Sequence, residues 1–434
     1  GRPHAVQRQA LHPDEDRGAG VSAALDAVTD ALGAAHRHAE LGAFWWLVDD
    51  RARQRAARLD GAAGFPLAGI PLAVKDSFDV AGSPTTGGLR HAHQHCAGSD
   101  ADAVRLLERA GAVAIGKTAM DPLAWTTHGQ ADGFPPCLNP VDPALSPGGS
   151  SAGSAVAVAA GIVGLGLGTD TAGSIRIPAA YCGVVGLKPA FGLVSLDGCL
   201  PLSASCDTVG LLAKTVAGCA AAYDALLAPS RTPTSALAAA ERERSDGPIG
   251  VLTDLFEASD PSVAAVCSQA LARLEAAGAS LEGVTLGWWA PRLGLLLAIE
   301  LAAAWGAQAD ADPGRFPPVI LTAIERARAV PAARYEEVRA ELRGGREQLE
   351  RRLSRFSALL SPTVPVPVPY LDEEDVAVST RFTRIFNALG WPALSVPCGS
   401  DSRGRPVGMH VATAGPVQDA VAVAAQVERA AAAA

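Results

Sequence analysis

Residues 146–178 constrain this chain more than any other stretch. They read SPGGSSAGSA, then a run that can be fully buried, and then GLGTDTAGSIRIP. The two flanks hold far more glycine and serine than a packed element needs, and glycine lets another group approach the main chain closely. The apolar run 156–168 between them fixes both flanks to a core. The stretch therefore predicts a chemical site built on a buried element.

A tight turn within this stretch leads into Ser174. Thr171, Ala172 and Gly173 precede the serine directly, and backbone N–H groups in such a turn can converge on a point beside its hydroxyl. This is the arrangement that an oxyanion hole requires. Ser174 is therefore the predicted nucleophile, and the N–H groups of residues 171–174 are the predicted oxyanion donors.

A nucleophilic serine needs a base, and none of the nine histidines lies in a serine-protease motif. One GxSxG match, centred on Ser151, follows a Ser-Pro-Gly turn instead of the strand that a nucleophile elbow requires. Lys75 is the better candidate because it ends the apolar run 70–74. Burial lowers the pKa of a lysine toward the range in which its neutral amine accepts a proton.

Three segments, 66–82, 146–155 and 166–189, together resemble the amidase signature family of serine hydrolases. The resemblance continues at PLSASCDTVGLLAKTV, LLSPTVPVPVP and FNALGWPALSVPCGS, and it fades between residues 217 and 358. It implies a triad of the nucleophile Ser174, Ser150 in a cis peptide, and Lys75. It also implies an α/β fold with a large mixed β-sheet covered on both faces by α-helices. One domain would span 1–434, with 228–358 as a variable, mostly helical excursion.

In the implied mechanism, neutral Lys75 takes a proton from Ser150, which takes one from Ser174. Ser174 attacks an amide carbonyl, and water resolves the acyl-enzyme without a cofactor or a metal. An amine in place of water would make the enzyme an acyl- or amidotransferase. Two further alternatives are the glutaminase subunit of a tRNA-dependent amidotransferase, which would need a partner protein, and a catalytically dead binding protein on the same fold.

The segment after Thr118 departs from the family's commoner GKTNMxEF form and reads AMDPLAWTTHGQADGFPP. By motif position, the backbone of residues 124–126 faces the acyl pocket. The candidates for lining that pocket are Ala124, Trp125, Thr126, His128 and Ser151. Because family members differ by substrate in this segment, the departure leaves the substrate unidentified.

Several polar residues near the site have structural interpretations. Asp170 and Arg176 flank the nucleophile and are expected to pair with each other and fix the turn. Ser151 and Ser154 either hydrogen-bond the proton relay or cap the following helix, and a capping role is favoured for Ser154. Further upstream, Ser99 is expected to cap an amphipathic helix over residues 100–111.

The order of apolar segments supports alternating helices and strands. Residues 21–58 predict two helices with LGAFWWLVDD between them, and residues 112–118 predict a second buried strand, as in a βαβ unit. A helix over 217–227, a strand over 248–254 and a helix over 261–278 follow. Residues 290–355 are predicted to be mostly helical.

Composition narrows the class of partner. The net charge of −9 and the pI of about 5.5 argue against a nucleic-acid-binding surface. Eight cysteines without CxxC spacing suggest neither a zinc site nor a disulfide scaffold. His91, His93 and His95 would share one face of a strand and could bind a metal, but the segment reads as a loop and favours a polar rim of the substrate entrance. Without a recognisable signal peptide or membrane span we expect a cytoplasmic enzyme acting on a small-molecule amide, with a homodimer as one option.

Overall fold

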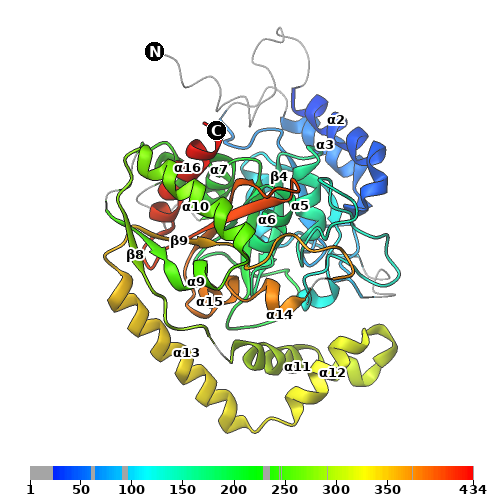
Figure 1. Ribbon diagram of the computed structural model, residues 1–434. Helices are drawn as coiled ribbons and strands as arrows, with labels where there is room; N and C mark the ends of the chain where they lie inside the picture. Colours follow the sequence, from blue (N-terminus) through cyan, green and yellow to red (C-terminus); the bar gives the residue numbers. More distant parts are fainter. Residues whose placement is uncertain are drawn as a thin grey trace.

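The computed structural model describes residues 23–59, 64–89, 96–227 and 235–433, apart from positions 244, 246, 291 and 374. In this part of the chain, helices cover both faces of one 11-stranded sheet (Figure 1). The predicted α/β fold with a large mixed sheet is thereby confirmed. Across the sheet the strands follow the order β1 (Phe44–Leu47), β3 (Val113–Thr118), β2 (Pro71–Lys75), β4 (Leu165–Asp170), β6 (Thr208–Ala213), β5 (Val185–Lys188), β10 (Ala393–Ser400), β11 (Pro406–Ala412), β9 (Ala358–Pro362), β7 (Ile249–Leu252) and β8 (Leu281–Val284).

The sheet mixes parallel and antiparallel pairs. β2 runs parallel to both β3 and β4, and β7 runs parallel to both β8 and β9, whereas the other neighbours are antiparallel. Helix α4 (Asp102–Arg109) connects β2 to β3, which confirms the predicted βαβ unit. Because β2 and β4 are parallel neighbours, their carboxyl ends, Lys75 and Asp170, lie at the same edge of the sheet.

Both faces of the sheet are packed, as the side chains of β2 illustrate. Leu72 and Val74 join one apolar core and Ala73 joins the other, because alternate residues of a strand point to opposite faces. Helices that contribute to the first core are α4, α7 (Val216–Leu226), α8 (Ala236–Ala240), α10 (Pro261–Ala276) and α16 (Val417–Ala432). Those that contribute to the second are α2 (Ala23–Arg37), α3 (Asp49–Leu59), α5 (Ala152–Ala159) and α6 (Arg176–Cys182).

Three helices form an arm beside the sheet layers, at the bottom of Figure 1. The arm consists of α11 (Leu293–Ala311), α12 (Pro318–Arg328) and α13 (Ala332–Leu353), as the helical prediction for 290–355 required. Among the helices of the described residues, only α11 has the length and the apolar composition that would allow a helix to cross a membrane. Its Glu300 is buried against other parts of this chain. The short helices α9 (Thr253–Glu257), α14 (Val376–Ser379) and α15 (Thr383–Ala388) complete the fold.

Two predicted helix caps are wrong. Helix α4 begins after Ala101, so Ser99 lies too far upstream to bond its first turn. Helix α5 begins after Ser151, which places Ser154 inside the first turn. The Ser154 hydroxyl instead donates to the carbonyl of Leu167 at 3.0 Å and lies 2.8 Å from Thr118 Oγ1. Ser154 therefore ties α5 to the two strands β4 and β3.

Candidate active site

The stretch 146–178 folds as a turn, a helix, a strand and a second turn, and it brings two serines together. Ser150 lies in the turn before α5, and its peptide bond with Gly149 is cis. Ser174 lies in the turn between β4 and α6. The N–H of Ser151 donates to the carbonyl oxygen of Ser174 at 3.1 Å, so the two turns are directly joined. Both serine side chains are buried.

Lys75 reaches this pair of turns from the carboxyl end of β2. Its Nζ atom donates to Ser150 Oγ at 2.7 Å and to Thr169 Oγ1 at 2.7 Å. The side chain is completely buried, and burial disfavours the charged ammonium. Although nearby acidic groups partly oppose the effect, burial lowers the pKa of Lys75 from 10.5 to about 8. A neutral amine at this position is therefore accessible near physiological pH.

The turn that carries Ser174 is fixed by a buried ion pair. Arg176 donates to Asp170 through Nε at 2.9 Å and Nη2 at 2.8 Å. Burial would raise the pKa of Asp170, but the charge and hydrogen bonds of Arg176 outweigh it and hold that pKa well below its usual range. Arg176 also donates to the carbonyl of Thr383 and to Asn387 Oδ1, so it connects the turn to α15. The expected Asp170–Arg176 pair is present.

The backbone donors of residues 171–174 are not equivalent. The N–H of Gly173 donates to Asp170 Oδ1 at 2.9 Å, so it is engaged within the turn. Gly173 has φ of 136°, and a Cβ there would lie 2.2 Å from Thr383 Oγ1, so this position admits only glycine. The N–H groups of Thr171, Ala172 and Ser174 are the remaining predicted oxyanion donors.

The five pocket candidates occupy different positions. Ala124 lines a pocket, whereas Trp125 packs in apolar clusters with residues of α11. The Thr126 hydroxyl and the His128 N–H both donate to Asp121 Oδ1, at 2.6 and 2.9 Å. Ser151 donates to the carbonyl of Thr169 at 3.1 Å. Thr126, His128 and Ser151 therefore make contacts that hold the loops around the site.

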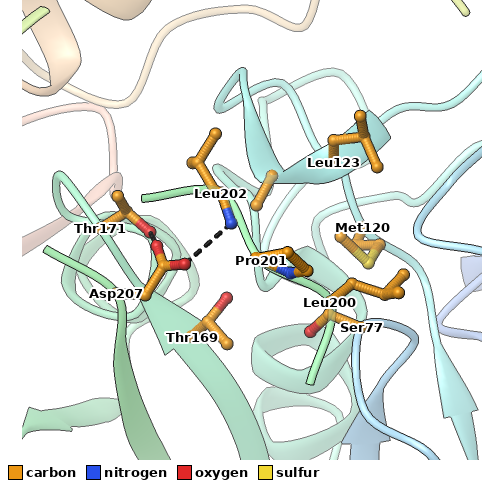
Figure 2. Close-up of a pocket in the computed structure, with 10 residues that line it drawn as sticks. Ser77, Met120, Leu123, Thr169, Thr171, Leu200, Pro201, Leu202 and Asp207 are labelled. Atoms are coloured by element: carbon orange, nitrogen blue, oxygen red, sulfur yellow. Dashed lines mark hydrogen bonds between the residues drawn. The ribbon is translucent and has the colours of Figure 1, made fainter. Parts of the chain in front are cut away.

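Thr169, whose hydroxyl accepts from Lys75 Nζ, lines the pocket drawn in Figure 2. Asp207 is the acidic side chain in its wall: Oδ1 accepts from the Thr171 hydroxyl at 2.6 Å, and Oδ2 accepts from the Leu202 N–H at 2.8 Å. Burial raises the pKa of Asp207 even though these donors oppose the shift. The complete lining comprises Ser77, Met120, Leu123, Ala124, Thr169, Thr171, Leu200, Pro201, Leu202 and Asp207.

Sequence reasoning missed four polar residues around the site. Thr169 is the second acceptor of Lys75, and Asp121 holds the loop after β3 through Thr126, His128 and the Gly129 N–H. Asp207 fixes the loop before β6. Glu300 of α11 accepts from the Ser205 hydroxyl at 2.5 Å and from Tyr335 at 2.8 Å. Thr169 could have been found by its position two residues before the turn, but no local pattern marks Glu300.

His91, His93 and His95 lie outside the described residues, so their expected role at the substrate entrance stays a prediction. Among residues with assigned positions, no group of three or more His, Cys, Asp or Glu side chains is arranged to hold a metal ion.

Comparisons with known proteins agree on the class of enzyme. The model of the Amidase family matches residues 26–421. The chain is 34% identical to a glutamyl-tRNA(Gln) amidotransferase subunit from Symbiobacterium thermophilum, over 89% of this chain and 90% of that protein. A crystal structure of an amidase superposes with a TM-score of 0.83 at 34% identity, covering 94% of this chain and 96% of the other. A complex described as revealing the origins of an s-triazine catabolic enzyme gives a TM-score of 0.87 at 29% identity, covering 94% of both chains.

Proposed function

The chain belongs to the amidase family, the amidase signature enzymes, and on that premise we propose that it hydrolyses a carboxylic amide through an acyl-enzyme on Ser174. It is an amidase-type enzyme, and amidotransferase chemistry fits the same family. One observation carries the proposed mechanism: Lys75 Nζ lies 2.7 Å from Ser150 Oγ, in the turn that bonds the backbone of Ser174.

In the proposed first half-reaction, Ser174 Oγ attacks the carbonyl carbon of the amide. Its proton passes to Ser150 while the proton of Ser150 passes to neutral Lys75. The relay then returns a proton to the nitrogen as the C–N bond breaks, and the amine leaves. In the second half-reaction, water attacks the ester carbonyl, its proton enters the same relay, and the carboxylic acid is released with Ser174 restored. No cofactor takes part.

Oxyanion stabilisation is assigned to the turn before α6. The N–H of Gly173 is engaged by Asp170, so we propose the N–H groups of Thr171, Ala172 and Ser174 as the donors available to the developing negative charge. Asp170 and Arg176 act as positioning residues in this proposal, because their buried pair fixes the turn. Preorganised donors stabilise charge best when they need not reorient during the reaction.

Several wider assignments remain proposals as well. We treat 1–434 as a single domain in which 228–358 is a variable region, although β7, β8 and α10 of that region belong to the main sheet and its packing. We propose a small-molecule amide as substrate, and a homodimer stays a prediction. Since the names of the relatives refer to a tRNA-linked process, we propose a cytoplasmic location.

The alternative of a glutaminase-type subunit is favoured by one finding, the names of the relatives. The protein from Symbiobacterium thermophilum is named as one subunit of an amidotransferase, which implies partner proteins for that enzyme. If this chain works in the same way, it will release ammonia from glutamine only when a partner protein is present. Release of product from simple amides by the isolated chain would favour the amidase.

The proposal is tested by incubating the wild-type protein and Ser174→Ala with simple aryl and alkyl amides, with and without hydroxylamine. Ser268→Ala is the matched control, because Ser268 is exposed on α10. Product is followed by mass spectrometry. Ser174→Ala should abolish turnover, whereas Ser268→Ala should retain it.

The outcomes separate the alternatives. Equal turnover by wild type and Ser174→Ala would exclude Ser174 as the nucleophile. A hydroxamate that dominates over the free acid would assign transferase chemistry instead of hydrolysis, because hydroxylamine would then outcompete water for the acyl-enzyme.

A further inference from the structure

The pocket lined by Thr169 has apolar walls, and its described lining holds no basic side chain. Resting on the proposed function, we infer that it binds the acyl portion of the substrate and that this acyl group is short, apolar and uncharged. This chemistry differs from that of glutamine, whose α-ammonium and α-carboxylate would both need charged partners. The inference therefore separates this chain from the activity that the names of its relatives suggest.

Two loops build the apolar walls. Met120, Leu123 and Ala124 come from the segment after β3, and Leu200 and Leu202 come from the segment before β6 (Figure 2). Leu123 and Ala124 have φ of 48° and 59°, so the first loop turns sharply at the pocket. The floor is polar but neutral, with the hydroxyls of Thr169 and Thr171. A carbonyl held near this floor would direct its apolar substituent toward the leucines.

The pocket is small. The enclosed space that a water molecule can reach is about 10 Å³, room for about one water, and the wider hollow of about 280 Å³ includes open solvent. A short alkyl group that also occupies the open side of the hollow matches this size. A long fatty acyl chain would have to leave the pocket.

The one charged side chain in the described lining is already engaged. Asp207 accepts from the Thr171 hydroxyl and from the N–H groups of Leu202 and Ser203, at 2.6, 2.8 and 2.9 Å. These bonds direct the carboxylate into its own loop. An anionic acyl group would meet a like charge here, and any charged group would lose its hydration without gaining a dedicated partner.

The arm holds the second wall in place. Trp305 of α11 donates through Nε1 to the carbonyl of Pro201 at 2.7 Å. About one turn earlier on the same helix, Glu300 accepts from the Ser205 N–H at 3.0 Å and from the Ser203 hydroxyl. Because both ends of segment 201–205 are bound to α11, the position of this wall depends on α11.

The test measures kcat/KM for 4-nitroanilides that differ only in their acyl group: acetyl, butyryl, hexanoyl, succinyl, 4-aminobutyryl and γ-glutamyl. A second series keeps the butyryl group and varies the amine. We expect butyryl to exceed acetyl by about 15-fold, since each of its two additional methylenes contributes about fourfold when buried. The three charged acyl groups should fall at least ~100-fold below butyryl.

Leu200→Ala gives a second test because it enlarges the pocket. The variant should shift the preferred acyl group toward hexanoyl. Leu193→Ala is the matched control, since Leu193 is an exposed leucine outside the pocket, and it should leave the preference unchanged.

Each result has one meaning. A charged acyl group that reacts as well as butyryl, or a rate that follows the amine and ignores the acyl group, overturns the inference while Ser174-dependent hydrolysis still supports the proposed function. If no anilide in either series gives turnover that depends on Ser174, the proposed function fails and the inference fails with it.

Discussion

The proposed role of Lys75 as the base predicts a steep dependence of activity on pH. Burial lowers the pKa of Lys75 to about 8, whereas its ordinary value is 10.5. Only the neutral amine accepts a proton, so activity must rise as pH passes upward through about 8. The neutral fraction is about one in eleven at pH 7 and about ten in eleven at pH 9, so the rate should rise about tenfold between them.

The same shift gives the contribution of burial to catalysis. An unperturbed lysine would be neutral in only about 0.03% of molecules at pH 7, so the lowered pKa increases the reactive fraction roughly 300-fold. The assay is kcat/KM for a non-ionising amide from pH 6.5 to 9.5, because kcat/KM reports the pKa values of the free enzyme. Lys75→Met should remove nearly all activity. Lys214→Met, a change at a lysine that donates to the Ala159 carbonyl near the surface, should leave the profile in place.

Thr169 provides a sharper version of this test. Its hydroxyl accepts from Lys75 Nζ at 2.7 Å and thereby favours the ammonium form. Thr169→Val removes that acceptor at nearly constant volume, so the pKa of Lys75 should fall and the rising limb should move to lower pH by about half to one unit. A flat profile between pH 6.5 and 9.5, or a limb centred near 10.5, would refute the assignment of Lys75 as a buried neutral base.

Two further predictions concern residues outside the triad. Glu300→Gln should reduce the difference in KM between hexanoyl and acetyl anilides and lower thermal stability, because glutamine keeps only one acceptor oxygen and its NH₂ group cannot accept the bonds that reach the other oxygen. Glu336→Gln on the exposed face of α13 is the control. An unchanged acyl preference in Glu300→Gln would contradict the role of the arm. Arg176→Ala should lower the free energy of unfolding, measured by urea denaturation, by about 3–5 kcal/mol, because it leaves the buried Asp170 without its cationic partner. Arg339→Ala, at an exposed ion pair, should lower it by less than about 1 kcal/mol. Equal losses in the two variants would show that the buried pair stabilises the fold no more than the exposed one.

The sequence predicted the interior of the sheet better than its edges. Strands β2, β3 and β7 were expected because they are short apolar runs that are mostly buried. The two edge strands, β1 and β8, were not expected. Their residues are half-buried or exposed, so they lack the continuous apolar run of a central strand and their pairing depends on the neighbour that the fold supplies. Sequence patterns therefore do not predict these edge strands.

The candidate site divides in a similar way. Ser150, Ser174 and Lys75 could be proposed as reacting groups because glycine-rich turns and a lysine that ends a buried strand are local features. The expected cis peptide before Ser150 is also present. The caps at Ser99 and Ser154 were wrong because a serine near a helix start is compatible with several partners, and Ser154 bonds two strands instead. Local sequence therefore indicates which residues can react, but less often which residues hold them.

The contacts that shape the pocket are long-range, and this explains why the substrate could not be read from the motifs. Glu300 and Ser203 are 97 positions apart, and Trp305 and Pro201 are 104 positions apart. Neither Glu300 nor Trp305 lies in one of the sequence motifs on which the family resemblance is based. The proposed reacting groups, in contrast, all lie on β2 and on the two turns beside β4. A relay placed on the central sheet can stay constant while the arm and the loop before β6 change the pocket wall, so the acyl preference should follow substitutions in α11 even where the relay is untouched.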